Sequence, residues 1–315
     1  MRKLKELSII ETALDQWEWS VDLDSRGKTV IQSDLQVIEG RRETDYYRKH
    51  KIYEKAGVPF TIYDVGYIQH EGLEVYEEYT KNFSDACYQA LDKGRGLLIA
   101  GGFCTYLPGI TGGIQRCMPL GSKLGVVFID GHADIETPEI THSHIVAGMP
   151  AAAMLGLGLE EWRKVAGMTE PILSENFIMG DYHARSEADD INIKRAKIDI
   201  VDEKQFKDLS LWNERIRKMS EQVDAIFLHV DVDILARKYV PAFKFPIPEN
   251  GQEVETVMQN IKTVMDTNKV IAFSIMDVCF TPEVEGAETT YKSAAALMSA
   301  GLENWKKIPD ICTKA

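Results

Sequence analysis

The most constraining feature of the chain is an apolar, mostly β-branched run at residues 126–129 that ends in three potential metal ligands. Such a run is typical of a strand buried on both faces of a parallel sheet. The ligands Asp130, His132 and Asp134 occupy every second position, and alternate residues of an extended chain point to one side. We therefore expect them to converge at the strand's carboxyl end, where open α/β sheets bind ligands.

A second apolar run begins at Ala225 and ends in Asp231 and Asp233, again two positions apart. Burying ionisable groups at strand ends costs free energy unless something compensates them, and cations are the simplest compensation. Carboxylate oxygens with an imidazole suit Mn²⁺ and related ions better than a thiol-rich zinc site would. Either motif alone is compatible with solvated loop acids, but the two together predict a metal site.

The remaining pattern predicts one α/β domain over residues 1–315. Further strands are expected near residues 60–65, 97–100, 177–180, 198–201 and 270–276, with helices between them. Strands that alternate with helices imply right-handed crossovers and a mostly parallel sheet. Residues 1–40 do not follow this alternation, and we expect them to form a divergent N-terminal extension with a short helix through Leu14.

Charge and cysteine content exclude some partners and compartments. A net charge of −13 argues against nucleic acid or an anionic membrane surface as a partner. The first residues lack the apolar core of a signal peptide, and no apolar run is long enough to span a bilayer. The five cysteines have no paired spacing. We expect reduced thiols and a cytoplasmic protein.

Four sequence blocks resemble the ureohydrolase (arginase/agmatinase) superfamily. Residues 130–138 are similar to its D-A-H-x-D-x-x-T-P segment, and residues 229–233 are similar to its S-x-D-x-D. Residues 101–104 stand where the family has G-G-D-H, and residues 275–278 stand where it has a late acidic strand. The order and spacing of the blocks agree over roughly residues 45–303.

The resemblance implies a three-layer α/β/α fold and a hydrolase that activates water between two divalent ions. The ions would be manganese first, with Fe²⁺, Co²⁺, Ni²⁺ or Zn²⁺ as alternatives, and the reaction would cleave a C–N bond in a linear guanidine or amidine. Carried over by position, the ligands are Cys104, Asp130, His132, Asp134, Asp231 and Asp233. Asp134 would also relay a proton to the leaving amine. A homo-oligomer, trimer or hexamer, is also implied.

The chain departs from the family at two histidine positions. Cys104 stands where the family has a metal-binding histidine, so a bound thiolate would shift the preference toward softer ions. The alternative is that Cys104 is a small buried residue beside a weak metal subsite. Ala147 stands where the family has a proton-shuttle histidine, and His142 and His144 are the candidates for that role, unless they are simply solvated.

The substrate positions also differ from those of arginases. The residues carried over are Glu136, Thr141, Ser143, Arg185, Phe245 and Asp277, the last being a catalytic candidate as well. Arg185 could receive a carboxylate and Glu136 an ammonium, or the two could pair with each other. This is not the pattern of plain L-arginine recognition. The candidate substrates are a modified arginine, agmatine, another guanidino acid or formiminoglutamate.

A different class of function is kept open by the two lost histidines. The chain would then be a degenerate, weakly metallated family member with a structural or regulatory role. A cysteine–histidine nucleophile receives no support from the sequence, because Cys104 has no histidine near it along the chain.

Overall fold

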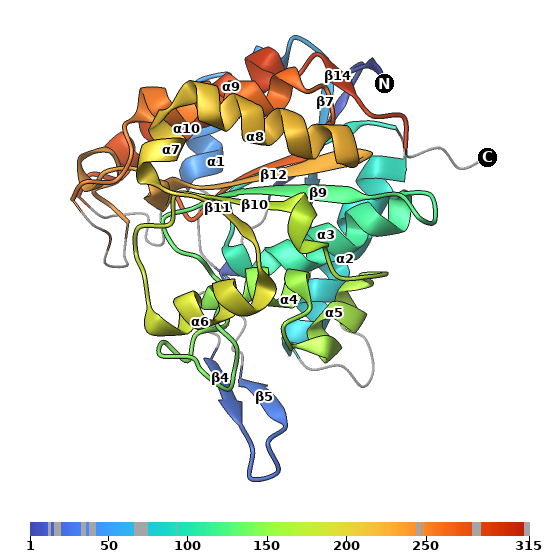
Figure 1. Cartoon of the computed structure of the whole chain (residues 1–315). Helices are drawn as coiled ribbons and strands as arrows, with labels where there is room; N and C mark the ends of the chain where they lie inside the picture. The colour runs from blue at the N-terminus through green and yellow to red at the C-terminus, as the bar shows by residue number, and fades with distance from the viewer. Residues whose placement is uncertain are drawn as a thin grey trace.

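A parallel sheet of eight strands runs through the middle of the molecule (Figure 1). The computed structural model describes residues 1–11, 14–15, 20–32, 36–37, 42–65, 75–92, 94–243, 247, 249–278 and 285–311. Among these residues the strand order is β11-β10-β9-β12-β13-β8-β2-β7, and every pairing is parallel. The strands are β2 (Leu7–Glu11), β7 (Phe60–Asp64), β8 (Gly96–Ala100), β9 (Leu124–Ile129), β10 (Phe177–Gly180), β11 (Asp199–Val201), β12 (Ala225–Asp231) and β13 (Val270–Met276).

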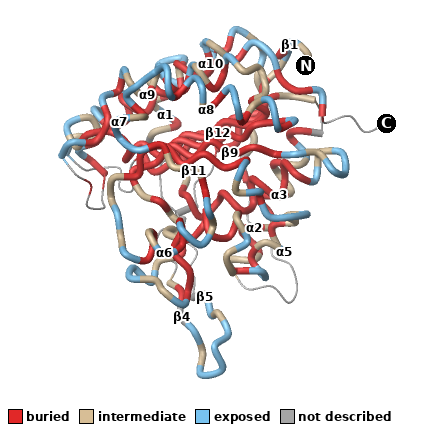
Figure 2. The backbone as a smooth tube through the Cα atoms, viewed as in Figure 1, coloured by how far each residue is buried: buried red, intermediate tan, exposed pale blue. Residues whose placement is uncertain are grey.

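Helices cover both faces of this sheet, so the expected three-layer α/β/α fold is confirmed (Figure 1). One layer holds α1 (Arg42–Lys49), α8 (Leu209–Gln222), α9 (Val254–Asp266) and α10 (Ala287–Asn304). The other holds α2 (Val75–Asp92), α3 (Leu107–Cys117), α4 (Pro150–Leu155) and α5 (Glu160–Ala166), while α6 (Glu187–Ala196) and α7 (Glu203–Lys207) lie in the connections around β11. Every residue of β8, β9, β12 and β13 is buried, as Figure 2 shows, because both faces of the sheet are covered.

The first strand of the sheet corrects a prediction. The helix expected through Leu14 is wrong, because Leu7–Glu11 forms β2 between β8 and β7. Its β-branched run can be buried on both faces, and the acid at its end is compensated. The buried carboxylate of Glu11 pairs with Arg48 and accepts a 2.6 Å hydrogen bond from the hydroxyl of Tyr53.

Further along, β4 (Ser20–Leu23) and β5 (Thr29–Gln32) form a hairpin that projects from the body of the molecule (Figure 1).

The four central strands end at the same level. Register partners at that level are Ala100, Ile275, Val230 and Ile129, on β8, β13, β12 and β9. The chain leaves β9 toward β10 on one side and leaves β12 toward β13 on the other. Such a reversal opens a crevice at the carboxyl ends of the strands, where open α/β sheets bind ligands.

Helix α3 follows β8 directly and fixes the position of Cys104, which lies in the single 3₁₀ turn before it. The helix is rich in glycine because its neighbours approach closely. A Cβ atom at Gly112 would lie 1.8 Å from the carbonyl oxygen of Ala166, and one at Gly113 would lie 2.6 Å from the Cβ of Cys87. No helix in the described part of the chain is long and apolar enough to cross a membrane.

We predict that Gly112→Ala destabilises the protein, although alanine is the better helix former by about 1 kcal/mol. The new methyl group would overlap backbone atoms that cannot move alone, and such overpacking costs about 1–3 kcal/mol, occasionally more. Urea unfolding should therefore show a net loss of about 1–2 kcal/mol. The exposed control Gln259→Ala on α9 should stay within about 0.5 kcal/mol of the parent. Equal stability of Gly112→Ala and the parent would contradict this packing.

Candidate metal centre

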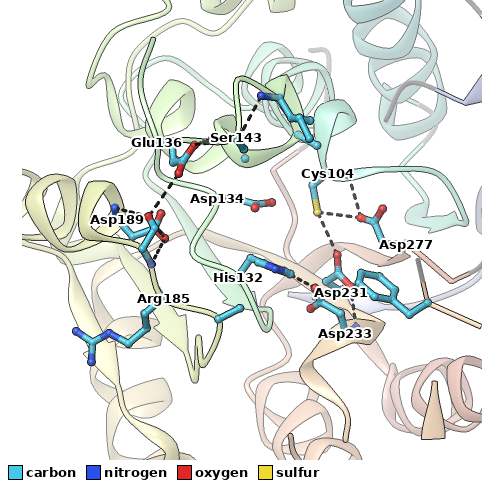
Figure 3. Close-up of a pocket in the computed structure, with 16 residues that line it drawn as sticks. Cys104, His132, Asp134, Glu136, Ser143, Arg185, Asp189, Asp231, Asp233 and Asp277 are labelled. Atoms are coloured by element: carbon cyan, nitrogen blue, oxygen red, sulfur yellow. Dashed lines mark hydrogen bonds and ion pairs between the residues drawn. The ribbon is translucent and has the colours of Figure 1, made fainter. Parts of the chain in front are cut away.

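A cavity of about 390 Å³ opens at the carboxyl ends of β8, β9, β12 and β13 (Figure 3). Acidic side chains dominate its floor, and they come from loops that are far apart along the sequence. The lining includes most of the residues expected from the sequence, namely Cys104, His132, Asp134, Glu136, Ser143, Ala147, Arg185, Asp231, Asp233 and Asp277. The structure thus brings the two ligand motifs together.

The first donor set, here called the His132 subsite, consists of Asp130, His132 and Asp233. One ligand atom from each residue lies within 4.8 Å of the others. The Nδ1 atom of His132 is 2.5 Å from Oδ2 of Asp233. His132 follows a bend at Gly131, and Asp233 lies in the 3₁₀ turn Val232–Ile234 after β12, so these turns, and not an alternating extended chain, bring the side chains to one point.

The second donor set, the Cys104 subsite, surrounds the thiol of Cys104. Its sulfur lies 3.1 Å from Oδ2 of Asp277, 3.5 Å from Oδ2 of Asp231 and 3.8 Å from Oδ2 of Asp130. It also lies 3.5 Å from Nε2 of His229. Because Asp130 belongs to both sets, the two subsites share one carboxylate, which places them side by side as a two-metal site would need.

Backbone amides hold the carboxylates in place. The N–H of His132 donates to Oδ1 of Asp130 at 2.6 Å, and the N–H of Gly131 donates to Oδ1 of Asp233 at 2.8 Å. The N–H of Asp233 donates to Oδ1 of Asp231, also at 2.8 Å. In each case the second oxygen faces the cluster. Held in this way, the carboxylates are oriented before any ligand binds.

The approach of the two chains also explains a glycine. A Cβ atom at Gly131 would lie 2.7 Å from the backbone oxygen of Asp233, so a side chain at this position would push the two strand ends apart.

Asp134 departs from the expected extended conformation, because its φ is +47°. Figure 3 shows its carboxylate between Glu136 and Cys104. It therefore enters the cavity from above the two donor sets.

The cluster holds more carboxylates than its cations compensate. Burial and repulsion by Asp233 raise the pKa of Asp130 and Asp231 well above the ordinary range, and burial raises the pKa of Asp277 to about 7. Burial and the nearby acids also raise the pKa of the Cys104 thiol. Although burial disfavours its charged form, His132 has its pKa raised to about 9 by Asp233. One imidazolium cannot neutralise this set, but divalent cations can.

Three expected substrate residues hydrogen-bond to one another at the wall of the cavity. The Oε2 atom of Glu136 accepts hydrogen bonds from the hydroxyls of Thr141 at 2.6 Å and Ser143 at 2.9 Å. Asp189, which was not anticipated, also lines the cavity and accepts a 2.7 Å hydrogen bond from the hydroxyl of Ser186. The wall is therefore acidic, and its carboxylates are ordered by hydroxyl groups.

Arg185 does not pair with Glu136, so that alternative from the sequence is wrong. Its guanidinium lies 2.5 Å from Oδ1 of Asp190 and over the ring of Tyr182. Figure 3 shows it directed away from the cluster. Arg185 precedes Ser186, the N-cap of α6, and the first turn of the helix brings Asp190 back to it, which a comparison of distant motifs does not reveal.

Two further predicted residues stay untested. His144 is exposed, with its Nδ1 3.4 Å from the carbonyl oxygen of Val21 on β4, and it lies outside the lining of the cavity among the described residues. Its shuttle role stays a prediction. Phe245 lies outside the described residues.

The sequence analysis missed His229 as a member of the site. Its imidazole is fully buried, and burial lowers its pKa to about 3, so it is neutral. A signal was available: His229, Asp231 and Asp233 repeat the alternate spacing of the first motif. The statement that Cys104 lacks a histidine partner holds along the chain but not in space.

Comparisons with known proteins agree with this geometry. Residues 29–302 match the model of the Arginase family. The chain belongs to the arginase family. It is 24% identical to the arginase of Emericella nidulans over 320 residues, which covers 96% of this chain and 95% of that one. The expected superfamily and the expected class, a hydrolase of the arginase family, are therefore confirmed.

Solved structures share the fold. An arginase from Bacillus subtilis superposes with a TM-score of 0.78 at 19% identity, covering 95% of this chain and 98% of that chain. A formimidoylglutamase from Bacillus subtilis superposes with a TM-score of 0.67 at 16% identity, covering 96% and 87%. At these identities the likeness concerns the fold alone.

We predict that removing divalent ions lowers the thermal stability of the full chain. The clustered acids then lose their compensation, and a ligand at about a thousand times its Kd contributes about 4 kcal/mol. The melting temperature should fall by about 5–10 °C on chelation and recover when Mn²⁺ or Zn²⁺ is returned. Asp130→Ala, which removes the carboxylate common to both donor sets, should show little response to the chelator. An unchanged melting temperature in the parent would contradict compensation by metal.

Proposed function

We propose that the protein is a hydrolase that uses two divalent metal ions to cleave a C–N bond in a linear guanidine or amidine, other than plain L-arginine. The observation that carries the proposal is the pair of donor sets that share Asp130 at the ends of neighbouring strands. The donors are Cys104, Asp130, His132, Asp134, Asp231 and Asp233. Mostly oxygen ligands with one imidazole favour manganese, and Fe²⁺, Co²⁺, Ni²⁺ and Zn²⁺ are the alternatives.

Two bound ions would supply a nucleophile from water near neutral pH. The chain itself supplies orientation and proton transfer. The carboxylate of Asp134 lies within the cavity, where it can accept a proton from the attacking water and pass it to the leaving amine (Figure 3). Asp277, whose Oδ2 accepts a 3.2 Å hydrogen bond from the N–H of Cys104, lines the same floor and can pair with the planar cation of the substrate.

The acidic wall supports a substrate with a cationic tail. Glu136 and Asp189 are both buried and both line the cavity beyond the metal ligands. Arg185, the one basic side chain among the described lining residues besides His132, is engaged with Asp190. An ammonium group is therefore better matched to this wall than a carboxylate, which places a guanidino amine of the agmatine type ahead of guanidino acids and formiminoglutamate.

A degenerate, weakly metallated protein is the second candidate. Its support is the thiol of Cys104 at a ligand position. Against it stands the set of buried carboxylates, which would repel one another in a chain that no longer bound metal.

We also propose that the protein works as a homo-oligomer in the cytoplasm. Among the described residues no disulfide joins Cys87, Cys104 or Cys117, which suits a reducing compartment.

Asp130→Ala and Asp233→Ala should each abolish hydrolysis. Each removes a charge from the donor sets, and we expect kcat/KM for a guanidino substrate to fall at least about a thousandfold, as loss of metal activation implies. Release of urea or ammonia measures the rate, and elemental analysis should show fewer bound ions. Asp266→Ala, an exposed acid at the end of α9, serves as the control and should keep full activity. Full activity in Asp130→Ala would refute the proposed chemistry.

Glu136→Gln should distinguish the substrate classes. The substitution keeps the shape and most hydrogen bonds of the side chain but removes its charge. For a guanidino amine we expect KM to rise at least about thirtyfold, as the cost of about 2 kcal/mol or more for breaking a buried charge pair implies, with kcat nearly unchanged. A guanidine with an uncharged tail should show no change. If Glu136→Gln instead lowered KM for a guanidino acid and left KM for the guanidino amine unchanged, the wall would be assigned to a carboxylate tail.

A further inference from the structure

His229 is a buried nitrogen donor that the proposed mechanism does not use. It lies on β12, two positions before Asp231, so both side chains point to the same face of the sheet. Its Nε2 atom is 3.5 Å from the sulfur of Cys104 and 3.7 Å from Oδ2 of Asp130. The third edge of this triangle, from that sulfur to Oδ2 of Asp130, measures 3.8 Å.

These distances match the edges of a small coordination polyhedron. Tetrahedral sites with metal–sulfur bonds of about 2.3 Å and metal–nitrogen or metal–oxygen bonds of about 2.0–2.2 Å place neighbouring donors about 3.4–3.6 Å apart. Sulfur, nitrogen and oxygen therefore form one face of a slightly expanded tetrahedron. Oδ2 of Asp231, 3.5 Å from the same sulfur, groups with Cys104 and Asp277 and not with this face, which leaves the fourth position of the tetrahedron open, as catalytic sites do.

The imidazole is also oriented as metal-binding histidines are. Its Nδ1 atom lies 2.9 Å from the hydroxyl oxygen of Ser274, its register partner on β13. The tautomer with its proton on Nδ1 satisfies this contact and leaves the lone pair of Nε2 directed at the thiol. Phe128 packs against the ring, with centroids 4.8 Å apart, and prevents it from turning away. Such a partner on the second nitrogen holds the ring in this direction, and it can accept a hydrogen bond from the Nδ1 proton when Nε2 binds a metal.

We propose that His229 is a metal ligand, and that with Cys104 and Asp130 it makes the Cys104 subsite a site of three protein donors for Zn²⁺, Co²⁺ or Fe²⁺ in preference to Mn²⁺. A thiolate with an imidazole favours these softer ions, whereas the His132 subsite offers carboxylates and one imidazole and suits harder ions. The metal centre is then asymmetric, with a tightly bound ion beside Cys104 and a weaker one beside His132. The inference rests on the proposed metal-dependent function and specifies which ions serve it.

X-ray absorption of the full chain carrying one equivalent of zinc tests this directly and needs no substitution. We expect one sulfur neighbour at about 2.3 Å and an imidazole on the same ion, because the first ion should enter the Cys104 subsite. An ion that has sulfur but no imidazole, or neither of them, would overturn the proposal.

A variant provides the second test. His229→Gln should lower the affinity for the first zinc ion by more than about a hundredfold, since even indirect partners of a metal cost about 10–100-fold. In the cobalt-loaded protein it should weaken the strong visible bands of four-coordinate cobalt, while the thiolate charge-transfer band stays. His50→Gln, at an exposed histidine in the turn after α1, is the matched control and should change neither. Circular dichroism shows whether the variant folds, and the zinc absorption experiment stands if it does not.

The failures of the two proposals are distinguishable. A parent protein that binds two ions and releases urea or ammonia, with unchanged zinc affinity and cobalt spectrum in folded His229→Gln, overturns the role of His229 and leaves the hydrolase standing. A parent protein that binds no divalent ion overturns both. Alkylation of Cys104 at the same rate with and without zinc would also overturn the proposal, since it would identify the thiol as free of metal and paired with His229 alone.

Discussion

Repulsion among buried carboxylates is the constraint on which the structure of the site depends. Three neighbouring strands, β9, β12 and β13, end at one level, and the chain at and after their ends delivers Asp130, Asp231, Asp233 and Asp277 to one cluster. Backbone N–H groups fix one oxygen of each, but amides do not neutralise charge. His132 is the one cationic group within the donor sets among the described residues. The repulsion is relieved by protons, which the raised pKa values of Asp130, Asp231 and Asp277 allow, or by divalent ions, which neutralise the carboxylates without protonating them.

Periodicity along the chain was enough to predict this part of the site. An apolar run that ends in alternate acids is a local pattern, and parallel strands place such ends at the same edge of a sheet. The same reasoning failed where the backbone departs from an extended strand. Asp134 adopts a left-handed conformation, so its direction follows from the turn and not from alternation. Leu7–Glu11 was expected to be helical, but it forms a buried strand. The acid at its end can be buried because Arg48, which lies far along the chain, compensates its charge.

Partners that meet only in space were the main gap. His229 and Cys104 are separated by 125 positions, and their contact depends on the order in which β8, β13 and β12 pair. Arg185 was judged by its charge alone, and its pairing with Asp190 follows from the start of α6. Sequence reasoning identifies which groups are able to bind, whereas the fold decides which of them find each other.

The two ends of the cavity have different chemistry, and together they define the proposed enzyme. The floor offers sulfur, nitrogen and oxygen donors for cations, and the wall offers Glu136 and Asp189 for a charged tail of a substrate. The most direct test of the central claim is elemental analysis of the full chain as purified. Two divalent ions per chain are predicted. A folded protein that contains none, and takes up none when Mn²⁺, Fe²⁺, Co²⁺, Ni²⁺ or Zn²⁺ is supplied, would contradict the account.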